Sequence, residues 1–596
     1  MKVYGAVLDG IDGKLIEVDS DINPELKKSI KIMGVKGVEI RDAAEAVLRV
    51  LPSTLPDSVE AKGLVTIDLI PRQGGSRSGD VLALPIGVRA YLALILQQVP
   101  ELPPPPKPGA SDEDIEKYNE LVKNLKAQAS LRAKIMKHIE KDNSEYLLIG
   151  GIRLDGRLYA PERGLMGLIS SAKDGMKVIV PSECAGYGYL AKLMLGKQGK
   201  SINILVADTF TDALHIIDGT SSGQKVKETD LHKMKKYEMP FSDYHDFSEI
   251  IGQHKAKYAL EIAAAGGHNV LLWGPKGEGK STLAKAIIGI LPSIFKRRQH
   301  ETFSPVAEVN KIYTAKGLLR PNQFIDCRPF RQVSAKTGAP GLIGSGHNPQ
   351  PGEISLAHCG VLMIDEFNFM DANTMEQLRV PLEDGYIDIT RAKGSYRFPA
   401  SFTLIATMNP CNDSYYGEYE CSECGKVVGD INGQCIDHPT AKPFHRCRCS
   451  LQDIKPFQNF SGPILDRIDL IVQTFSVDPF APEAKRESSE EVKKRVELAI
   501  KKQRDRYTNS AQLRCNAEIK HKHIEQNIIR MNTFAQRTAQ DIRQRHRLNT
   551  RSYVRLHAVA RTIADLKDKD IMTEKDIIEA HKIMGRDVFN KPAGRV

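Results

Sequence analysis

Residues 274–282 have the types and spacing of a loop that holds the phosphates of a nucleotide. The segment matches G-x-x-x-x-G-K-[ST] and lies between an apolar strand and a helical run, the context that this motif requires. Glycines let backbone amides surround the phosphates, the lysine adds charge on the β and γ oxygens, and the serine hydroxyl binds Mg²⁺. The predicted contacts to ATP and Mg²⁺ are Gly274, Gly277, Gly279, Lys280, Ser281 and Thr282.

Two carboxylates follow the next apolar run. Residues 361–364 read as a buried strand that ends in Asp365 and Glu366. Open α/β sheets bind their ligands at this carboxyl edge. We expect Asp365 to hold Mg²⁺ through water and Glu366 to polarise the attacking water, because phosphoryl transfer depends mainly on positioning and electrostatics. Together with the phosphate loop, this pair predicts ATP hydrolysis.

Two polar residues further along have the chemistry to assist. Asn409 ends the strand-like run 404–408 and can hydrogen-bond the γ-phosphate or the water; a turn-forming Asn before Pro410 is the alternative. Arg467, within 461–469, has a planar guanidinium that suits the charge on a transferring phosphoryl group. Taken alone, an arginine between two aspartates is more often a surface ion pair.

The cysteines predict a metal site. Six of the ten fall between positions 411 and 449, and the chain starts without an export signal, so we expect metal rather than disulfides. The spacing C-x2-C, ten residues, then C-x2-H is typical of tetrahedral zinc. Cys411 lies near this set, free thiols are the alternative, and the choice of four ligands stays open. The candidate zinc ligands are Cys421, Cys424, Cys435, His438, Cys447 and Cys449.

A predicted hairpin at 387–398 carries Arg391, Lys393 and Arg397. Such side chains can hold nucleic-acid phosphates without reading sequence. A solvated hairpin explains the charge alone equally well. The formal net charge of +10, from 84 basic and 74 acidic residues, permits an acidic partner without requiring one.

The elements that must position these residues predict a multidomain α/β protein. Strands at 270–273, 361–364 and 402–406 alternate with helical runs, as in a parallel sheet, and the chain after 479 is helical. A helix over 111–140 follows a proline-rich connector, and Ser111 and Asp114 resemble a capping box at its start. We expect this helix to pack against its own domain, with binding to a partner as the alternative. No run is apolar and long enough to cross a bilayer, so we expect a cytoplasmic protein. The predicted parts are an α+β domain at 1–217 with an insertion at about 101–144, a linker at 218–245, a P-loop core at 246–478 with a zinc-binding insertion at about 411–450, and an all-helical lid at 479–596.

Four segments, 263–269, 348–358, 461–469 and 560–566, resemble the magnesium-chelatase-like AAA+ ATPases of the ComM/YifB group. The resemblance implies a homo-hexameric ring with ATP between subunits. It implies that Asn409 is sensor 1, that Arg467 is a finger reaching a neighbour's ATP, and that Arg551 is sensor 2, with Arg555 as its competitor. It also implies a ring that moves along DNA without sequence preference and promotes branch migration, with the 387–398 hairpin facing the pore.

The N-terminal region resembles the Lon-protease-type domain of this group. Residues 71–76 resemble the loop of the protease serine, which places that role on Ser76, and residues 150–157 resemble a later strand and turn. Met166 stands where a protease would have its lysine, and a thioether cannot accept a proton from a serine. We therefore expect an inactive domain.

The resulting expectation is an ATP-driven DNA translocase or helicase. The alternative is an AAA+ motor of a metal-chelatase complex, whose ATPase would be indifferent to DNA, or of a protein-remodelling complex, which would need a protein client.

Overall fold

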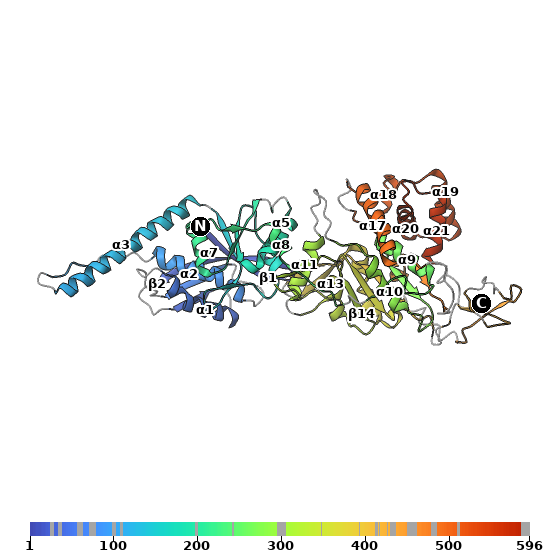
Figure 1. Ribbon diagram of the computed structural model, residues 1–596, viewed down its shortest axis with the longest axis horizontal. Helices are drawn as coiled ribbons and strands as arrows, with labels where there is room; N and C mark the ends of the chain where they lie inside the picture. The colour runs from blue at the N-terminus through green and yellow to red at the C-terminus, as the bar shows by residue number, and fades with distance from the viewer. Residues whose placement is uncertain are drawn as a thin grey trace.

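The computed structural model describes the chain except residues 24–28, 34–37, 56–63, 71–78, 98–102, 108–110, 143, 197–198, 200, 241–243, 295–304, 347–348, 392–393, 412–414, 416–417, 426, 430–436, 450–461, 478–485, 509–512 and 586–596. Figure 1 shows an elongated molecule with an N-terminal α/β part, a central α/β core and a group of C-terminal helices on one side of that core. Among the described residues, no helix is long and apolar enough to span a membrane.

The N-terminal part is built on an eight-stranded mixed sheet in the order β10-β9-β8-β5-β1-β2-β4-β3. Buried residues of β1 and β2 pack against the helices α1 (Val38–Thr54), α2 (Ala83–Gln97), α4 (Leu165–Ser170) and α5 (Ala185–Leu195). The strands are β1 Lys2–Asp9, β2 Asp12–Asn23, β3 Ser29–Met33, β4 Leu64–Ile70, β5 Glu145–Leu148, β8 Lys177–Pro181, β9 Asn203–Ala207 and β10 Gln224–Lys225.

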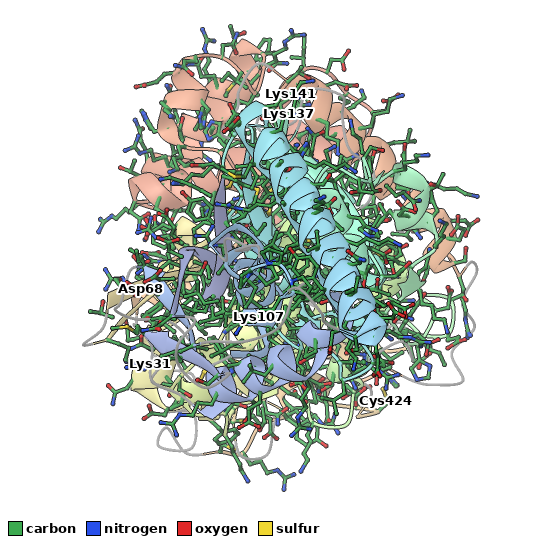
Figure 2. All side chains as sticks on the ribbon, turned by 90° about the vertical axis from the view of Figure 1, so that its left-hand side faces the viewer. Lys31, Asp68, Lys107, Lys137, Lys141 and Cys424 are labelled. Carbon is green, nitrogen blue, oxygen red and sulfur yellow. The ribbon has the colours of Figure 1, made fainter. Side chains whose placement is uncertain are left out.

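Helix α3 (Asp112–Lys141) projects from this part (Figure 1). Ser111 caps it, because its hydroxyl accepts from the Asp114 amide at 3.2 Å, as the capping pattern predicts. The expected packing of this helix on its own domain is limited to its C-terminal half, where Gln128 and Ile135 are its only buried residues. Figure 2 views the molecule from the side on which this helix projects; the helix runs diagonally across the view, with Lys137 and Lys141 labelled together at one of its ends.

The central core is an all-parallel five-stranded sheet in the order β14-β15-β18-β12-β22. The predicted strands appear as β12 (Val270–Trp273), β15 (Val361–Asp365) and β18 (Thr403–Met408). Their apolar runs are buried on both faces, which is the pattern of a parallel sheet covered by helices, and each such side chain contributes about 1.5–3 kcal/mol. The flanking strands β14 (Phe330–Ser334) and β22 (Leu470–Gln473) complete the sheet.

The C-terminal region is helical, as its charged periodicity predicts. It packs on α9 (His254–Gly266) and α10 (Lys280–Ile290) through one continuous apolar cluster. The helices are α17 Ser489–Arg506, α18 His521–Glu525, α19 Thr533–Arg545, α20 Thr550–Leu566 and α21 Glu574–Met584.

The segment expected as a linker contains regular elements. β10 extends the N-terminal sheet, α8 (Glu228–His232) packs on α5, and β11 (Lys235–Lys236) pairs in parallel with β13 (Gln323–Phe324) of the core. Polar composition alone does not distinguish such short edge elements from a loop.

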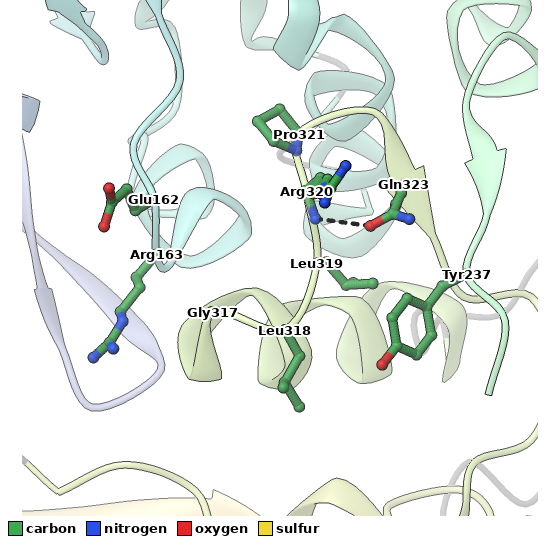
Figure 3. Close-up of a pocket in the computed structure, with 9 residues that line it drawn as sticks. All are labelled: Glu162, Arg163, Tyr237, Gly317, Leu318, Leu319, Arg320, Pro321 and Gln323. Carbon is green, nitrogen blue, oxygen red and sulfur yellow. Dashed lines mark hydrogen bonds between the residues drawn. The ribbon is translucent and has the colours of Figure 1, made fainter. Parts of the chain in front are cut away.

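The N-terminal part also contacts the core directly. Helix α4 packs on α11 (Pro305–Lys316), and the Gly164 amide donates to the Thr314 carbonyl at 2.8 Å. Beside this contact lies an open pocket of about 720 Å³ (Figure 3). Glu162 and Arg163 line one side of it and residues 317–321 the other, so the pocket belongs to the junction and not to the nucleotide loop.

Candidate nucleotide site

The phosphate loop connects the carboxyl end of β12 to the first turn of α10. Gly274 has φ +155°, and a Cβ there would lie 2.3 Å from the carbonyl oxygen of Thr474, so a side chain would clash with the neighbouring strand connection. Gly279 precedes α10 with φ +68°, a left-handed conformation that costs other residues about 1–2 kcal/mol. The predicted glycines are therefore required by the backbone path.

Lys280 is buried at the start of α10, with its side chain folded back over the loop. Its Nζ donates to the carbonyl oxygens of Gly274 and Pro275 at 2.9 and 2.5 Å. These two carbonyl oxygens accept from the ammonium group and hold it against the phosphate loop. Burial lowers the pKa of Lys280 to about 8, although Asp365 and Glu278 partly oppose that shift.

This pKa predicts proton uptake on ATP binding. Above about pH 8 the free site holds a neutral lysine, and the arriving phosphates favour its charged form. Binding therefore takes up a proton, and affinity falls by up to about tenfold per pH unit above that value. Calorimetry at about pH 9 in two buffers of different ionisation enthalpy should show an uptake approaching about one proton per site.

The matched controls for that measurement are arginine substitutions. Lys280→Arg should abolish the uptake, because a guanidinium stays charged throughout this range. Lys276→Arg, at an exposed position of the same loop, should keep it. Equal uptake in Lys280→Arg and the parent chain would show that another group takes the proton.

Ser281, Asp365 and Thr407 form the polar centre of the site. The Ser281 hydroxyl donates to Asp365 Oδ2 at 2.9 Å, and the Thr407 hydroxyl donates to Asp365 Oδ1. The sheet register explains this, because Ile364 pairs with Ala406, which places the next residues of β15 and β18 side by side. Hydroxyl and carboxylate oxygens are the ligands that Mg²⁺ prefers, so these residues fit a nucleotide-bound Mg²⁺ that neutralises phosphate charge.

Glu366 follows immediately and is exposed, with φ +53°. A left-handed backbone is uncommon outside glycine and costs energy that the surrounding structure must offset. This turn ends the strand and carries the carboxylate beyond the sheet edge, where a water could reach it. Asn409 lies directly after β18 and is half-buried, at the same edge.

Arg467 and Arg551 meet on one carboxylate that the sequence reasoning did not identify. Arg467 Nη2 and Arg551 Nη2 each donate to Glu383, in α15 (Arg379–Asp384), and Arg467 Nη1 also donates to the Pro463 carbonyl at 2.6 Å. The Arg467 side chain is only 3% exposed. In this chain its guanidinium is turned inward, so a role at another subunit's ATP requires it to leave Glu383.

Arg555, the competitor for the sensor 2 role, has a different environment. Its Nε lies 3.2 Å from the buried Asp469, and its Nη1 donates to the Ala517 carbonyl at 2.8 Å. Burial opposes ionisation of Asp469, but Arg555 and His268 together hold its pKa below the ordinary value. Arg555 thus joins the lid to the core as a structural cation.

Asn269 and His268 lie in segment 263–269, one of the four that resemble the ComM/YifB group. Their side chains connect parts of the chain at the amino edge of the sheet, opposite the phosphate loop. Asn269 Nδ2 donates to the Arg467 carbonyl at 2.9 Å, and its Oδ1 accepts from the Leu404 amide at 2.8 Å. His268 Nε2 lies 2.8 Å from Thr562 Oγ1 in the lid. These buried contacts position the backbone that carries Arg467.

The basic hairpin consists of β16 (Tyr386–Arg391) and β17 (Gly394–Pro399). Arg391 is exposed and Lys393 lies outside the described residues. Arg397 makes a bidentate pair with Asp388, both distances 2.8 Å, and covers the Tyr386 ring at 3.9 Å. The positive charge of Arg397 is therefore largely offset within the hairpin. The positions of the basic residues in the sequence did not indicate this pairing with Asp388.

The same hairpin contacts the N-terminal part. Its inward side chains Ile387, Ile389 and Phe398 belong to an apolar cluster that also contains β1 and α4 residues. Tyr396 hydrogen-bonds Asp9 at the β1–β2 turn, and its burial there raises the pKa of the phenol, as does that carboxylate. One face of the hairpin is thus fixed to the N-terminal sheet.

The candidate zinc ligands separate into two groups. Cys421, Cys424 and His438 lie with their ligand atoms within 4.8 Å of one another, whereas Cys447 and Cys449 lie within the same distance of Cys411 instead. Cys435 lies outside the described residues.

Comparisons with known proteins agree with this architecture. Residues 246–432 match the family model of magnesium chelatase, subunit ChlI, and residues 486–583 match the model of its C-terminal region. The uncharacterized protein YifB of Escherichia coli (strain K12) is 32% identical over 453 residues, which cover 73% of this chain and 76% of that protein. The chain belongs to the magnesium-chelatase-like ComM/YifB family.

Two other relatives define how far the likeness extends. Competence protein ComM of Haemophilus influenzae is 31% identical over 419 residues, which cover 68% of this chain and 74% of that protein. The magnesium-chelatase 38 kDa subunit of Rhodobacter capsulatus is 29% identical over only 174 residues, 28% of this chain and 50% of that protein. Membership of the ComM/YifB family supports a parallel-sheet AAA+ core and ATPase activity.

Sequence reasoning missed several residues of this ComM/YifB site. Thr407 had a signal, since it occupies the penultimate position of the predicted strand before Asn409. Asn269 and His268 lay in a recognised segment without an assigned contact. Glu383 had no signal, because its two partners are 84 and 168 residues away in the chain.

Proposed function

We propose that this chain is an ATP-driven DNA translocase or helicase that works as a homo-hexameric ring and promotes branch migration during recombination. The observation that carries the proposal is the cluster of Lys280, Ser281, Asp365 and Glu366 at the carboxyl edge of the parallel sheet. Membership of the ComM/YifB family supports the DNA assignment. The chelatase-type relative matches only 28% of the chain, which makes a metal-chelatase motor the weaker alternative.

In this proposal each ATP lies between two subunits. The loop and Lys280 bind the phosphates, Ser281 and Asp365 hold Mg²⁺, and Glu366 polarises the attacking water. Asn409 orients that water or the γ-phosphate, while Arg467 of a neighbour and Arg551 of the lid stabilise charge on the transferring phosphoryl group.

The decisive experiment is the steady-state ATPase rate without DNA, with single-stranded DNA and with a four-way junction. We expect DNA to raise the rate in the full chain, and the DNA-dependent part to vanish in Lys280→Ala. A rate that no DNA changes would contradict a DNA-coupled motor and favour a protein or chelatase partner.

DNA binding itself should depend on the hairpin in a graded way. Arg391→Ala and Lys393→Ala should each reduce the slope of log affinity against log salt by about 1, because each removes a phosphate contact. Arg397→Ala is the matched control and should have the smaller effect, since Asp388 already offsets that charge. Unchanged slopes in Arg391→Ala and Lys393→Ala would remove the hairpin from the DNA interface.

We also propose that the N-terminal part is a Lon-protease-like domain without peptidase activity. Met166 is fully buried in α4 within an apolar cluster, and its thioether cannot accept a proton from a serine. Ser76 lies outside the described residues. We expect purified protein to leave casein intact with ATP present; casein degradation that Ser76→Ala abolishes would contradict this proposal.

The insertion after β18 is proposed to bind structural zinc through Cys421, Cys424 and His438, with Cys435 as the fourth ligand that the sequence spacing supplies. The three-stranded sheet β20-β19-β21 carries this site, with β19 (Tyr419–Cys421) between β20 (Val427–Gly429) and β21 (Pro443–His445). So small a sheet has too little apolar surface for independent stability, and a bound metal would compensate for that.

A further inference from the structure

Two separate groups of metal-ligating side chains lie in the insertion, although the sequence predicted one site. We call Cys421, Cys424 and His438 the sheet triad, and Cys411, Cys447 and Cys449 the root triad. The ligand atoms within each triad lie within 4.8 Å of one another, and the triads share no residue. A single tetrahedral ion takes four ligands around one point, so the six residues of the two triads cannot all bind one ion.

The root triad has the geometry of thiolates around a metal. Cys411 Sγ and Cys447 Sγ are 3.6 Å apart, much longer than the S–S bond of about 2.05 Å in a disulfide. Two thiolates that each bind zinc at about 2.3 Å stand about 3.8 Å apart at the tetrahedral angle. The measured separation therefore fits two ligands of one zinc ion.

The surrounding backbone favours the charged form of the sulfur. The Cys449 amide donates to Cys447 Sγ at 3.4 Å, and hydrogen bonds of this kind orient and stabilise a metal-bound thiolate. The three cysteines also converge from distant positions, since Cys411 and Cys447 are 36 residues apart in the chain. Ordinary apolar packing explains a buried cysteine, but here Cys447 and Cys449 are only half-buried.

The root triad lies at the two ends of the predicted insertion, which spans about 411–450. Cys411 comes two residues after Asn409, at the end of β18. Next to Cys447, Arg446 Nη1 donates to Glu418 Oε2 at 3.0 Å. Glu418 is fully buried and accepts from the Ser476 amide at 2.9 Å, just beyond β22.

We propose that Cys411, Cys447 and Cys449 bind a second zinc ion, separate from the one proposed for the sheet triad. This ion joins the two ends of the insertion at the carboxyl edge of the sheet and holds the chain that follows Asn409. Three protein ligands leave one tetrahedral position for a water molecule or a further side chain. The inference deepens the proposal that the insertion binds zinc and does not depend on DNA or on hydrolysis.

The test is the zinc content of freshly purified full-length protein, measured by mass spectrometry of the metal. We expect two ions per chain in the parent, one in Cys447→Ser, one in Cys424→Ser, and none in the double variant. Cys327→Ser, outside the insertion, and Lys280→Ala, without ATP turnover, should both keep two.

Each other outcome has a definite meaning. Zinc that falls in Cys424→Ser but not in Cys447→Ser would leave the sheet site and overturn the root site. One ion in the parent, lost in either variant, would show a single shared site and also overturn the inference. No zinc in the parent would overturn both zinc proposals while leaving the ATPase and DNA experiments unaffected.

A second measurement covers a variant that fails to fold. Parent protein produced with Co²⁺ in place of Zn²⁺ should bind two equivalents per chain, with absorption from thiolate-to-cobalt charge transfer. Binding of one equivalent would contradict the second site without use of any substitution.

Discussion

ATP hydrolysis is expected to fall by about 10²–10⁴-fold in Glu366→Gln, the range of a lost general base. Glutamine has the same shape but cannot take a proton from the attacking water. Glu366 is exposed beyond the end of β15. It takes no part in the hydrogen bond between Ser281 and Asp365, so nucleotide binding should persist. Phosphate release at saturating ATP gives kcat, and a fluorescent nucleotide gives the affinity.

The matched control for that substitution is Glu376→Gln, a carboxylate at the end of the neighbouring helix α14 (Ala372–Glu376). It should retain kcat within about twofold, as expected for a side chain outside the reaction centre. A Glu366→Gln protein with normal kcat would exclude the general-base role, and one that no longer binds ATP would indicate a structural role instead.

The second large effect is expected at Arg467. Arg467→Ala should lower kcat by about 10³–10⁵-fold, the contribution of an arginine finger, with ATP affinity nearly unchanged. This substitution also removes the contact with Glu383, so Glu383→Gln serves as a structural control that breaks the same pair and leaves the arginine in place. Activity retained in Glu383→Gln and lost in Arg467→Ala would separate catalysis from folding.

A mixing experiment distinguishes action on a neighbour from action within one chain. Arg467→Ala subunits keep an intact nucleotide site, and Lys280→Ala subunits keep an intact arginine. Rings that contain both should recover part of the activity that each lacks alone, because the finger of one can serve the ATP of the other. No recovery in rings shown to be mixed would place the role of Arg467 within its own subunit.

The placements that could be predicted from the sequence are those of residues whose partners are close in the chain or fixed by strand order. The phosphate loop needs only its own glycines and helix, and Asp365 and Glu366 follow from a strand that ends at the ligand edge. The capping of α3 by Ser111 is equally local. In each case, backbone geometry within a few residues determines the result.

The parts that sequence could not supply depend on side chains brought together over long distances. The pairing of Arg397 with Asp388 required the register of the hairpin. The division of the cysteines into two triads could be seen only from the path of the insertion in the structure. Spacing along the chain does not show that Cys411 and Cys447 lie side by side. Glu383 could be linked to Arg467 only once α15 was placed beside the chain that precedes β22.

The shared hold of Glu383 on Arg467 and Arg551 has a mechanical consequence. Arg551 belongs to the lid helix α20 and Arg467 to the core, so one carboxylate connects the lid to the core. In the proposed sensor 2 role, phosphates that attract Arg551 would remove one of the two competitors for Glu383 and so change how firmly Glu383 retains Arg467. In the proposed ring, closure of one lid would therefore change how readily Arg467 reaches the ATP of the next subunit. Hydrolysis would then proceed from subunit to subunit in one direction.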